Sequence, residues 1–144
     1  MAKRTSNSTA RELYRSAVAM HEMTKLAEPH IKPKNEKQHA VYIGYYFNLG
    51  FSIELYLKAF LRDKTGEDVS KYGHDLGKVF NAATASGFEF EKDKISQIIN
   101  IIGDAHRSHI YRYAEGATEF EYINERHLVE IALNACSEGM SNLR

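Results

Sequence analysis

The residues best suited to chemistry lie together in one segment, residues 106–113, which reads HRSHIYRY. Two histidines, two arginines and two tyrosines occur within these eight residues. A histidine exchanges a proton near neutral pH, and an arginine guanidinium can hold a phosphate group through two hydrogen bonds. Such a set is suited to phosphodiester cleavage or to binding alone. The residues that we predict to bind a ligand are His106, Arg107, His109, Arg112 and Tyr113.

Helical spacing places the two histidines of this patch on one side of the chain. His106 and His109 lie one turn apart and continue a stripe of isoleucines that is typical of a buried helix face. They are therefore expected to line a groove or an interface. A structural role is the alternative, in which cationic side chains complement the negative end of a helix and bond to neighbouring tyrosines.

The spacing of other reactive residues gives less support for a site. A metal ion shared by His106 and His109 would need further ligands, for which His74 and Asp75 are the candidates, and the chain lacks the tight pairs of structural metal sites. Cys136 lies on the apolar face of the last predicted helix, where a thiol packs as a small hydrophobic group. We predict no metal and no cofactor.

The element that must position these residues is a helix spanning about residues 39–62, which has no proline and is apolar on almost every side. Such a helix must lie inside a bundle. Glu54 and Lys58 interrupt its apolar surface four residues apart, in the order that favours an ion pair across one turn. We expect these two side chains to make a polar contact inside the bundle or at its rim.

Four further helices are expected around this one. The first begins at a cap between residues 5 and 9 and stops before Pro29. The third opens at HDL, residues 74–76, where Asp75 caps the helix and His74 bonds to a neighbouring element. The fourth runs from about residue 91 to 113, and the fifth covers about residues 124–140, with these residues facing inward: Leu128, Ile131, Ala132, Ala135 and Cys136. The sequence predicts a single all-α domain, residues 1–144, with a flexible lead-in at 1–8 and an up-and-down bundle of about five helices.

Composition indicates a cytoplasmic protein with no membrane association. The chain has 144 residues, a single cysteine and a formal net charge of zero. Charge is nevertheless uneven, since residues 1–39 hold eight lysines and arginines against four acids and residues 114–144 hold two against six. The two ends are therefore expected to meet within one chain or between two copies of it.

Three pieces of the sequence together resemble the HEPN superfamily, the higher eukaryote and prokaryote nucleotide-binding domains. They are IELYLKAFL at residues 53–61, YGHDL at residues 72–76 and HIYRY at residues 109–113. The resemblance implies a helical bundle that dimerises, that occurs in toxin-antitoxin and phage-defence systems and that is often encoded beside a nucleotidyltransferase partner. Many members are metal-independent ribonucleases that use an arginine and a histidine about four to six residues apart in a late helix.

This chain departs from that catalytic motif, since Arg107 precedes His109 by only two positions. We therefore expect a HEPN-like homodimer whose patch binds a nucleotide, RNA or a partner protein without catalysis. One alternative is a metal-independent endoribonuclease, in which His109 accepts a proton from a ribose hydroxyl and Arg107 or Arg112 stabilises the phosphate. Another is a purely structural oligomerisation domain.

Overall fold

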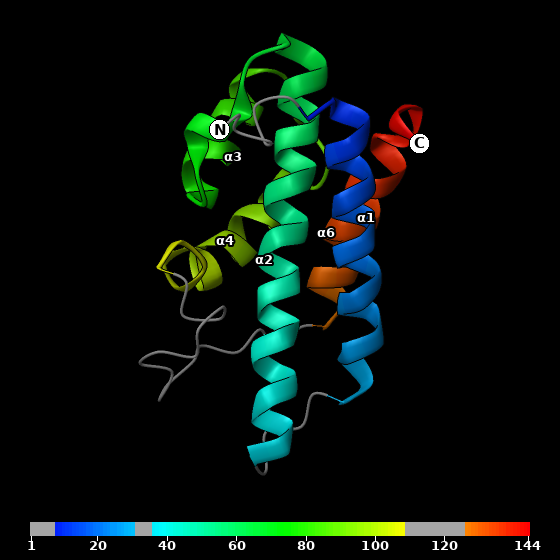
Figure 1. Ribbon diagram of the computed structural model, residues 1–144, viewed down its shortest axis with the longest axis vertical. Helices are drawn as coiled ribbons and strands as arrows, with labels where there is room; N and C mark the ends of the chain where they lie inside the picture. The colour runs from blue at the N-terminus through cyan, green and yellow to red at the C-terminus, as the bar shows by residue number, and fades with distance from the viewer. Residues whose placement is uncertain (1–7, 31–35, 109–125) are drawn as a thin grey trace.

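The longest helix, α2 (Glu36–Thr65), is the element on which the rest of the fold is assembled (Figure 1). The computed structural model describes residues 8–30, 36–108 and 126–144, which form five α-helices, three short 3-10 helices and no strand. The other α-helices are α1 (Ala10–Ala27), α3 (Leu76–Ala85), α4 (Lys92–Arg107) and α6 (Arg126–Gly139). α2 contacts all four of them, and α4 contacts both α3 and α6. The all-α class is therefore confirmed.

The central helix is buried on most sides, as its sequence predicts. The buried hydrophobic residues of its second half do not follow one narrow stripe: Leu49, Ile53, Tyr56, Leu57, Ala59, Phe60 and Leu61. The helix ends at Thr65, and Gly66 follows with a φ of 70°. Glycine adopts this left-handed conformation without a steric penalty, so the sequence GED can turn the chain away from the helix.

α1 lies antiparallel to α2 along most of its length (Figure 1). Its start is fixed by a capping box, in which the Glu12 amide donates to the Thr9 hydroxyl over 3.1 Å and the Thr9 amide donates to the Glu12 carboxylate over 3.4 Å. The helix ends at Ala27, before Pro29, as predicted.

α3 also begins where the sequence predicts. The Lys78 amide donates to the Asp75 carboxylate over 3.0 Å, and Leu76 enters the core. The predicted end of the fourth helix near residue 113 is wrong, because α4 ends at Arg107. Ser108 adopts a non-helical conformation there, and its hydroxyl donates to the Asp104 carbonyl over 2.8 Å. The Ser108 amide donates to the same carbonyl over 3.0 Å. Local bonds of this kind from a serine compete with the helical pattern and favour termination of the helix.

The last helix is confirmed between residues 126 and 139, and its predicted start at residue 124 lies outside the described residues. Leu128, Ala132 and Cys136 face inward as predicted, and burial raises the pKa of the Cys136 thiol to about 12. The inward placement of Ile131 is wrong, since this side chain is 43% exposed. Val129 and Leu133 are buried instead, so the contact face is rotated away from Ile131.

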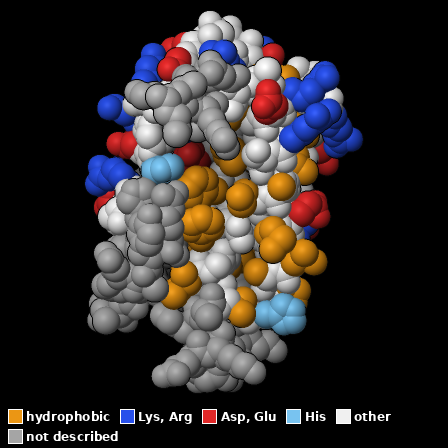
Figure 2. All heavy atoms as spheres, viewed as in Figure 1, with side chains coloured by type: hydrophobic (Ala, Val, Ile, Leu, Met, Phe, Trp, Pro, Cys, Tyr) orange, Lys and Arg blue, Asp and Glu red, His pale blue; other side chains and the backbone are white. Residues whose placement is uncertain are grey.

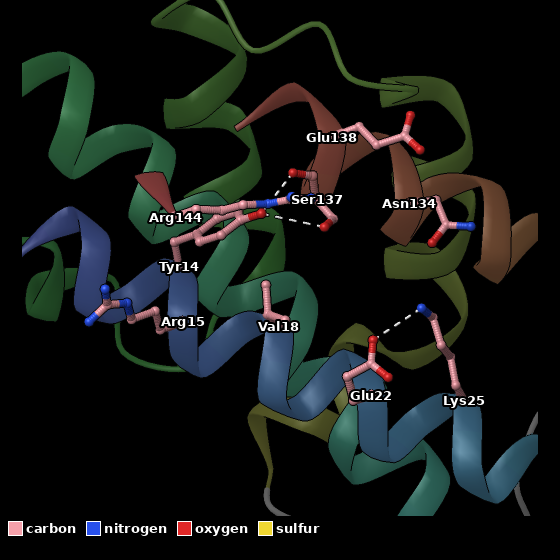
Figure 3. Close-up of a pocket in the computed structure, with 9 residues that line it drawn as sticks. All are labelled: Tyr14, Arg15, Val18, Glu22, Lys25, Asn134, Ser137, Glu138 and Arg144. Carbon is pink, nitrogen blue, oxygen red and sulfur yellow. Dashed lines mark hydrogen bonds and ion pairs between the residues drawn. The ribbon is translucent and has the colours of Figure 1, made fainter. Parts of the chain in front are cut away.

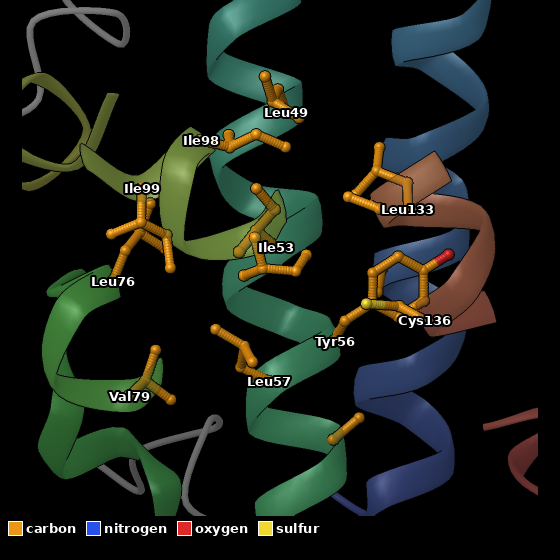
Figure 4. Packing of buried hydrophobic residues seen from close by; sticks show 14 of the residues in the cluster. Leu49, Ile53, Tyr56, Leu57, Leu76, Val79, Ile98, Ile99, Leu133 and Cys136 are labelled. Atoms are coloured by element: carbon orange, nitrogen blue, oxygen red, sulfur yellow. The ribbon is translucent and has the colours of Figure 1, made fainter. Parts of the chain in front are cut away.

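The core lies on both sides of α2 (Figure 4). Side chains of α3 and α4 pack against one side of α2, and side chains of α6 pack against another. The surface of the molecule is mixed in character. On the face seen in Figure 2, hydrophobic side chains lie over α1 and α2, with charged side chains around them. Among the described residues, no helix combines the length and the apolar character needed to cross a membrane.

A buried histidine also joins α1 to α2. His21 is 4% exposed, and its Nδ1 lies 2.9 Å from the Tyr56 hydroxyl oxygen. Burial, with a smaller contribution from Lys25, lowers the pKa of His21 from 6.5 to about 4, although Glu22 acts in the opposite direction. The imidazole is therefore neutral in the folded protein at neutral pH.

Acidification should destabilise the protein through His21. The unfolded chain binds a proton below about pH 6.5 but the folded chain only below about pH 4, so the free energy of unfolding should fall between these values, by up to roughly 3 kcal/mol. Urea denaturation of wild type and His21→Gln at neutral pH and at about pH 4.5 checks this. The variant should lose less stability on acidification, whereas the exposed control His127→Gln should behave like wild type. Equal losses in wild type and His21→Gln would contradict the assignment.

Candidate functional site

The densest polar site among the described residues surrounds a buried carboxylate on α2. Glu54 is 2% exposed. Lys58, one turn further along α2, donates to its Oε2 over 3.1 Å, which confirms the predicted contact between these residues. The Lys58 ammonium also donates to the Gly73 carbonyl over 2.8 Å. The pair is thus buried and additionally hydrogen-bonded, as a charged pair in a protein interior must be.

Two histidines converge on the other oxygen of the same carboxylate. His106 Nε2, in the last turn of α4, lies 2.9 Å from Glu54 Oε1. His74 Nδ1, immediately before the cap of α3, lies 3.0 Å from the same atom. We call Glu54, Lys58, His74 and His106 the Glu54 cluster. It joins α2 to the start of α3 and to the end of α4.

Glycines make room for this arrangement. A methyl group added at Gly50 would overlap the His106 ring, so only glycine lets α4 approach α2 this closely. Gly73 has a φ of 55°, and the turn it forms directs its carbonyl at Lys58 and places His74 beside Glu54. The ring of Phe51 contacts both imidazoles, with centroid distances of 5.4 Å to His74 and 4.9 Å to His106.

The Glu54 carboxylate is ionised at neutral pH. Burial acts to raise the pKa of Glu54, but the hydrogen bond from His106, the charge of Lys58 and the hydrogen bond from His74 together outweigh burial and lower it. Because a carboxylate can only accept hydrogen bonds, both imidazoles donate a ring N–H to it.

Two adjacent residues of the predicted patch, His106 and Arg107, lie in different environments. His106 is 4% exposed and bonds to Glu54, whereas the Arg107 side chain is 59% exposed. The Arg107 guanidinium lies 3.4 Å from the Asp104 carboxylate and 3.9 Å from that of Asp75. It borders a shallow hollow of about 240 Å³ between α3 and α4. The other predicted ligand residues, His109, Arg112 and Tyr113, lie outside the described residues, so the patch as a whole remains a prediction.

A larger groove, of about 510 Å³, lies between α1 and α6 (Figure 3). Tyr14 extends from α1 to α6 and donates a hydrogen bond to the Ser137 carbonyl over 2.8 Å, and Lys25 pairs with Glu22 over 3.1 Å. The groove carries charges of both signs and no concentrated patch. The sequence does not predict this groove, because its lining residues come from the two ends of the chain and form no motif.

The contact between His106 and Glu54 is likewise not predicted from the sequence. The sequence holds part of the signal, since His106 continues the isoleucine stripe of α4, although that stripe predicts a place in a groove or an interface for it. A buried imidazole needs a polar partner, and Glu54 was expected to be polar and central. Pairing the two from sequence would have required the packing of α4 on α2.

Comparison of the chain with protein-family models, curated proteins and solved structures gives no match. The fold and the Glu54 cluster therefore define the protein as a small all-α domain organised around a buried Glu–Lys–His–His group.

Replacing Lys58 with methionine should lower the free energy of unfolding by about 2 to 4 kcal/mol, because Glu54 would stay buried without its lysine counter-charge. Glu67 and Lys71 provide a matched control, with the same spacing and a 3.0 Å ion pair whose lysine side chain is 59% exposed. Lys71→Met should leave the stability nearly unchanged. Urea denaturation near neutral pH measures both, and equal effects would show that burial of the Glu54–Lys58 pair does not matter.

Replacing Gly50 with alanine should destabilise the protein by about 1 to 3 kcal/mol, because the new methyl group would displace His106 from Glu54. Gly44 lies in the same helix, and a methyl group there meets nothing within 4 Å. Gly44→Ala should therefore stabilise the protein by up to about 1 kcal/mol through helix propensity. Thermal unfolding of the two variants compares them directly, and stabilisation by both would contradict the close approach of α4 to α2.

Proposed function

We propose that the protein is a HEPN-like up-and-down helical bundle that binds a nucleotide, RNA or a partner protein at the C-terminal end of α4, without catalysis. Of these ligands, one that carries a phosphate group is favoured by the chemistry of the arginines in the patch. A homodimer and a nucleotidyltransferase partner belong to the same proposal, and they rest on the resemblance and on the opposite charges of the two ends of the chain.

The observation that carries the proposal is the meeting of residues from separate parts of the resemblance. Glu54 and Lys58 come from its first piece, and Gly73 and His74 from its second. In the structure the Lys58 ammonium bonds to Glu54 and to the Gly73 carbonyl, and His74 bonds to Glu54. Because these residues depend on one another in one buried cluster, the two sequence pieces have a physical reason to occur together. This contact supports the resemblance.

The chemistry of the described residues favours binding over cleavage. His106 is buried and donates to Glu54, so it is not placed to exchange a proton with a bound substrate. Arg107 is exposed, and ion pairs of this kind contribute only about 0 to 1 kcal/mol, so a phosphate can replace Asp104 and Asp75 as its partner. Arg107 is therefore available to bind an anion.

The test is binding of a fluorescein-labelled single-stranded RNA, measured by anisotropy over a series of salt concentrations. Affinity should fall steeply with salt, and Arg107→Ala should reduce the slope of log K against log salt by about one, because one phosphate contact is lost. Arg11→Ala, an exposed arginine on α1, is the matched control and should change the slope less.

A cleavage assay in EDTA distinguishes the alternatives. RNA cleavage by wild type that is lost in His109→Ala would contradict the non-catalytic proposal in favour of a metal-independent endoribonuclease. Absence of both binding and cleavage would contradict the proposal for RNA and favour an oligomerisation domain.

A further inference from the structure

We propose that Glu54, His74 and His106 form a binding site for one divalent transition-metal ion, of which zinc is the representative. One ligand atom from each residue lies within 4.8 Å of those of the other two. The closest approaches are those of the two imidazole nitrogens to Glu54 Oε1, at 2.9 and 3.0 Å. This inference concerns the interior cluster and does not depend on the proposed binding of RNA at Arg107.

Two of the three separations are close to those that a metal ion requires, and the third, between the two imidazole nitrogens, is at most 4.8 Å. Zinc binds nitrogen and oxygen at about 2.0 to 2.2 Å, so two ligands of a tetrahedral ion are about 3.3 Å apart. The distances from Glu54 Oε1 to His106 and His74 need to lengthen by only a few tenths of an ångström. The proton that each imidazole now donates would move to its other ring nitrogen or leave, since a ligand nitrogen must be deprotonated.

The donor set and its burial define the class of ion. Two imidazoles and one carboxylate suit zinc, cobalt or nickel, whereas magnesium and calcium prefer oxygen ligands throughout. The Glu54 and His106 side chains are 3% and 2% exposed, but that of His74 is 32% exposed. An ion can therefore enter from the side of His74, where a water molecule completes the coordination.

The site has structural supports that hold its ligands in place. Gly50 leaves the space that the His106 ring occupies, and Phe51 contacts both imidazole rings. The Gly73 turn sets the position of His74. Metal affinity depends on such supports, because they fix the orientation of each ligand before the ion arrives.

Lys58 opposes the ion, and this opposition makes the proposal specific. Its ammonium lies 3.1 Å from Glu54 Oε2, so a divalent ion on Oε1 would share the carboxylate with a positive charge. Removing that charge should strengthen metal binding, whereas it should weaken the metal-free fold. A bound ion would then supply the counter-charge for Glu54 that the variant lacks.

The direct test is titration of the EDTA-treated full chain with zinc by calorimetry and with cobalt by visible absorption. We expect one ion per chain and the absorption bands of tetrahedral cobalt. His74→Ala should weaken zinc binding by about tenfold or more, and because His74 is partly exposed this variant should remain folded, which circular dichroism checks. His127→Ala, an exposed histidine on α6, should bind as wild type does. No binding, or equal binding by His74→Ala and wild type, would overturn the proposal.

The second arm uses Lys58→Met. Zinc should raise its midpoint of thermal unfolding by more than that of wild type, and magnesium should raise neither. An equal zinc effect on the two proteins, or none on either, would place any bound zinc away from Glu54. Neither arm measures RNA, so failure here leaves the proposed function intact, and failure of RNA binding leaves this site intact.

Discussion

The burial of the Glu54 charge is the constraint on which the packing of α3 and α4 against α2 depends. An ionised carboxylate in a protein interior is costly unless it is paired and fully hydrogen-bonded. Glu54 meets this requirement with partners from three segments: Lys58 on its own helix, His74 before α3 and His106 at the end of α4. Any shift of α3 or α4 along α2 would leave the charge with fewer partners, so the cluster fixes a position that apolar packing alone specifies less sharply.

The opposite side of α2 is fixed by polar contacts of another kind. The Ser52 hydroxyl donates to the Ala17 carbonyl on α1 over 3.1 Å, and His21 on α1 contacts the Tyr56 hydroxyl. These groups are neutral, so their burial costs less than that of Glu54 and needs fewer partners. The central helix thus carries a charged cluster toward α3 and α4 and neutral hydrogen bonds toward α1, and both lie within an otherwise apolar core.

Local signals predicted the parts of this structure that depend on nearby residues. The cap at Asp75 and the spacing of Glu54 and Lys58 were sufficient for the start of α3 and for a polar contact within α2, because the interacting groups lie within one turn of each other. The contact between His106 and Glu54 joins residues 52 positions apart, and no local pattern encodes it. The predicted burial of Ile131 was wrong for a related reason. Helical spacing places an apolar residue near one face of the helix, but the packing of the neighbouring helices determines which apolar residues of that face are buried.

The loop before α3 contributes residues to both candidate sites, the buried Glu54 cluster and the exposed Arg107. His74 donates to the buried Glu54, and the next residue, Asp75, both caps α3 and lies 3.9 Å from the exposed Arg107. A phosphate would compete with the Asp75 carboxylate for the Arg107 guanidinium, and a metal ion at Glu54 would replace the hydrogen bond between His74 and Glu54 with a coordination bond to His74. The two proposed ligands would therefore act on adjacent residues of one turn, which is shaped by Gly73 and by the Asp75 cap. Because both ligands would act through this turn, binding of one is expected to alter the affinity for the other by the same factor in each direction.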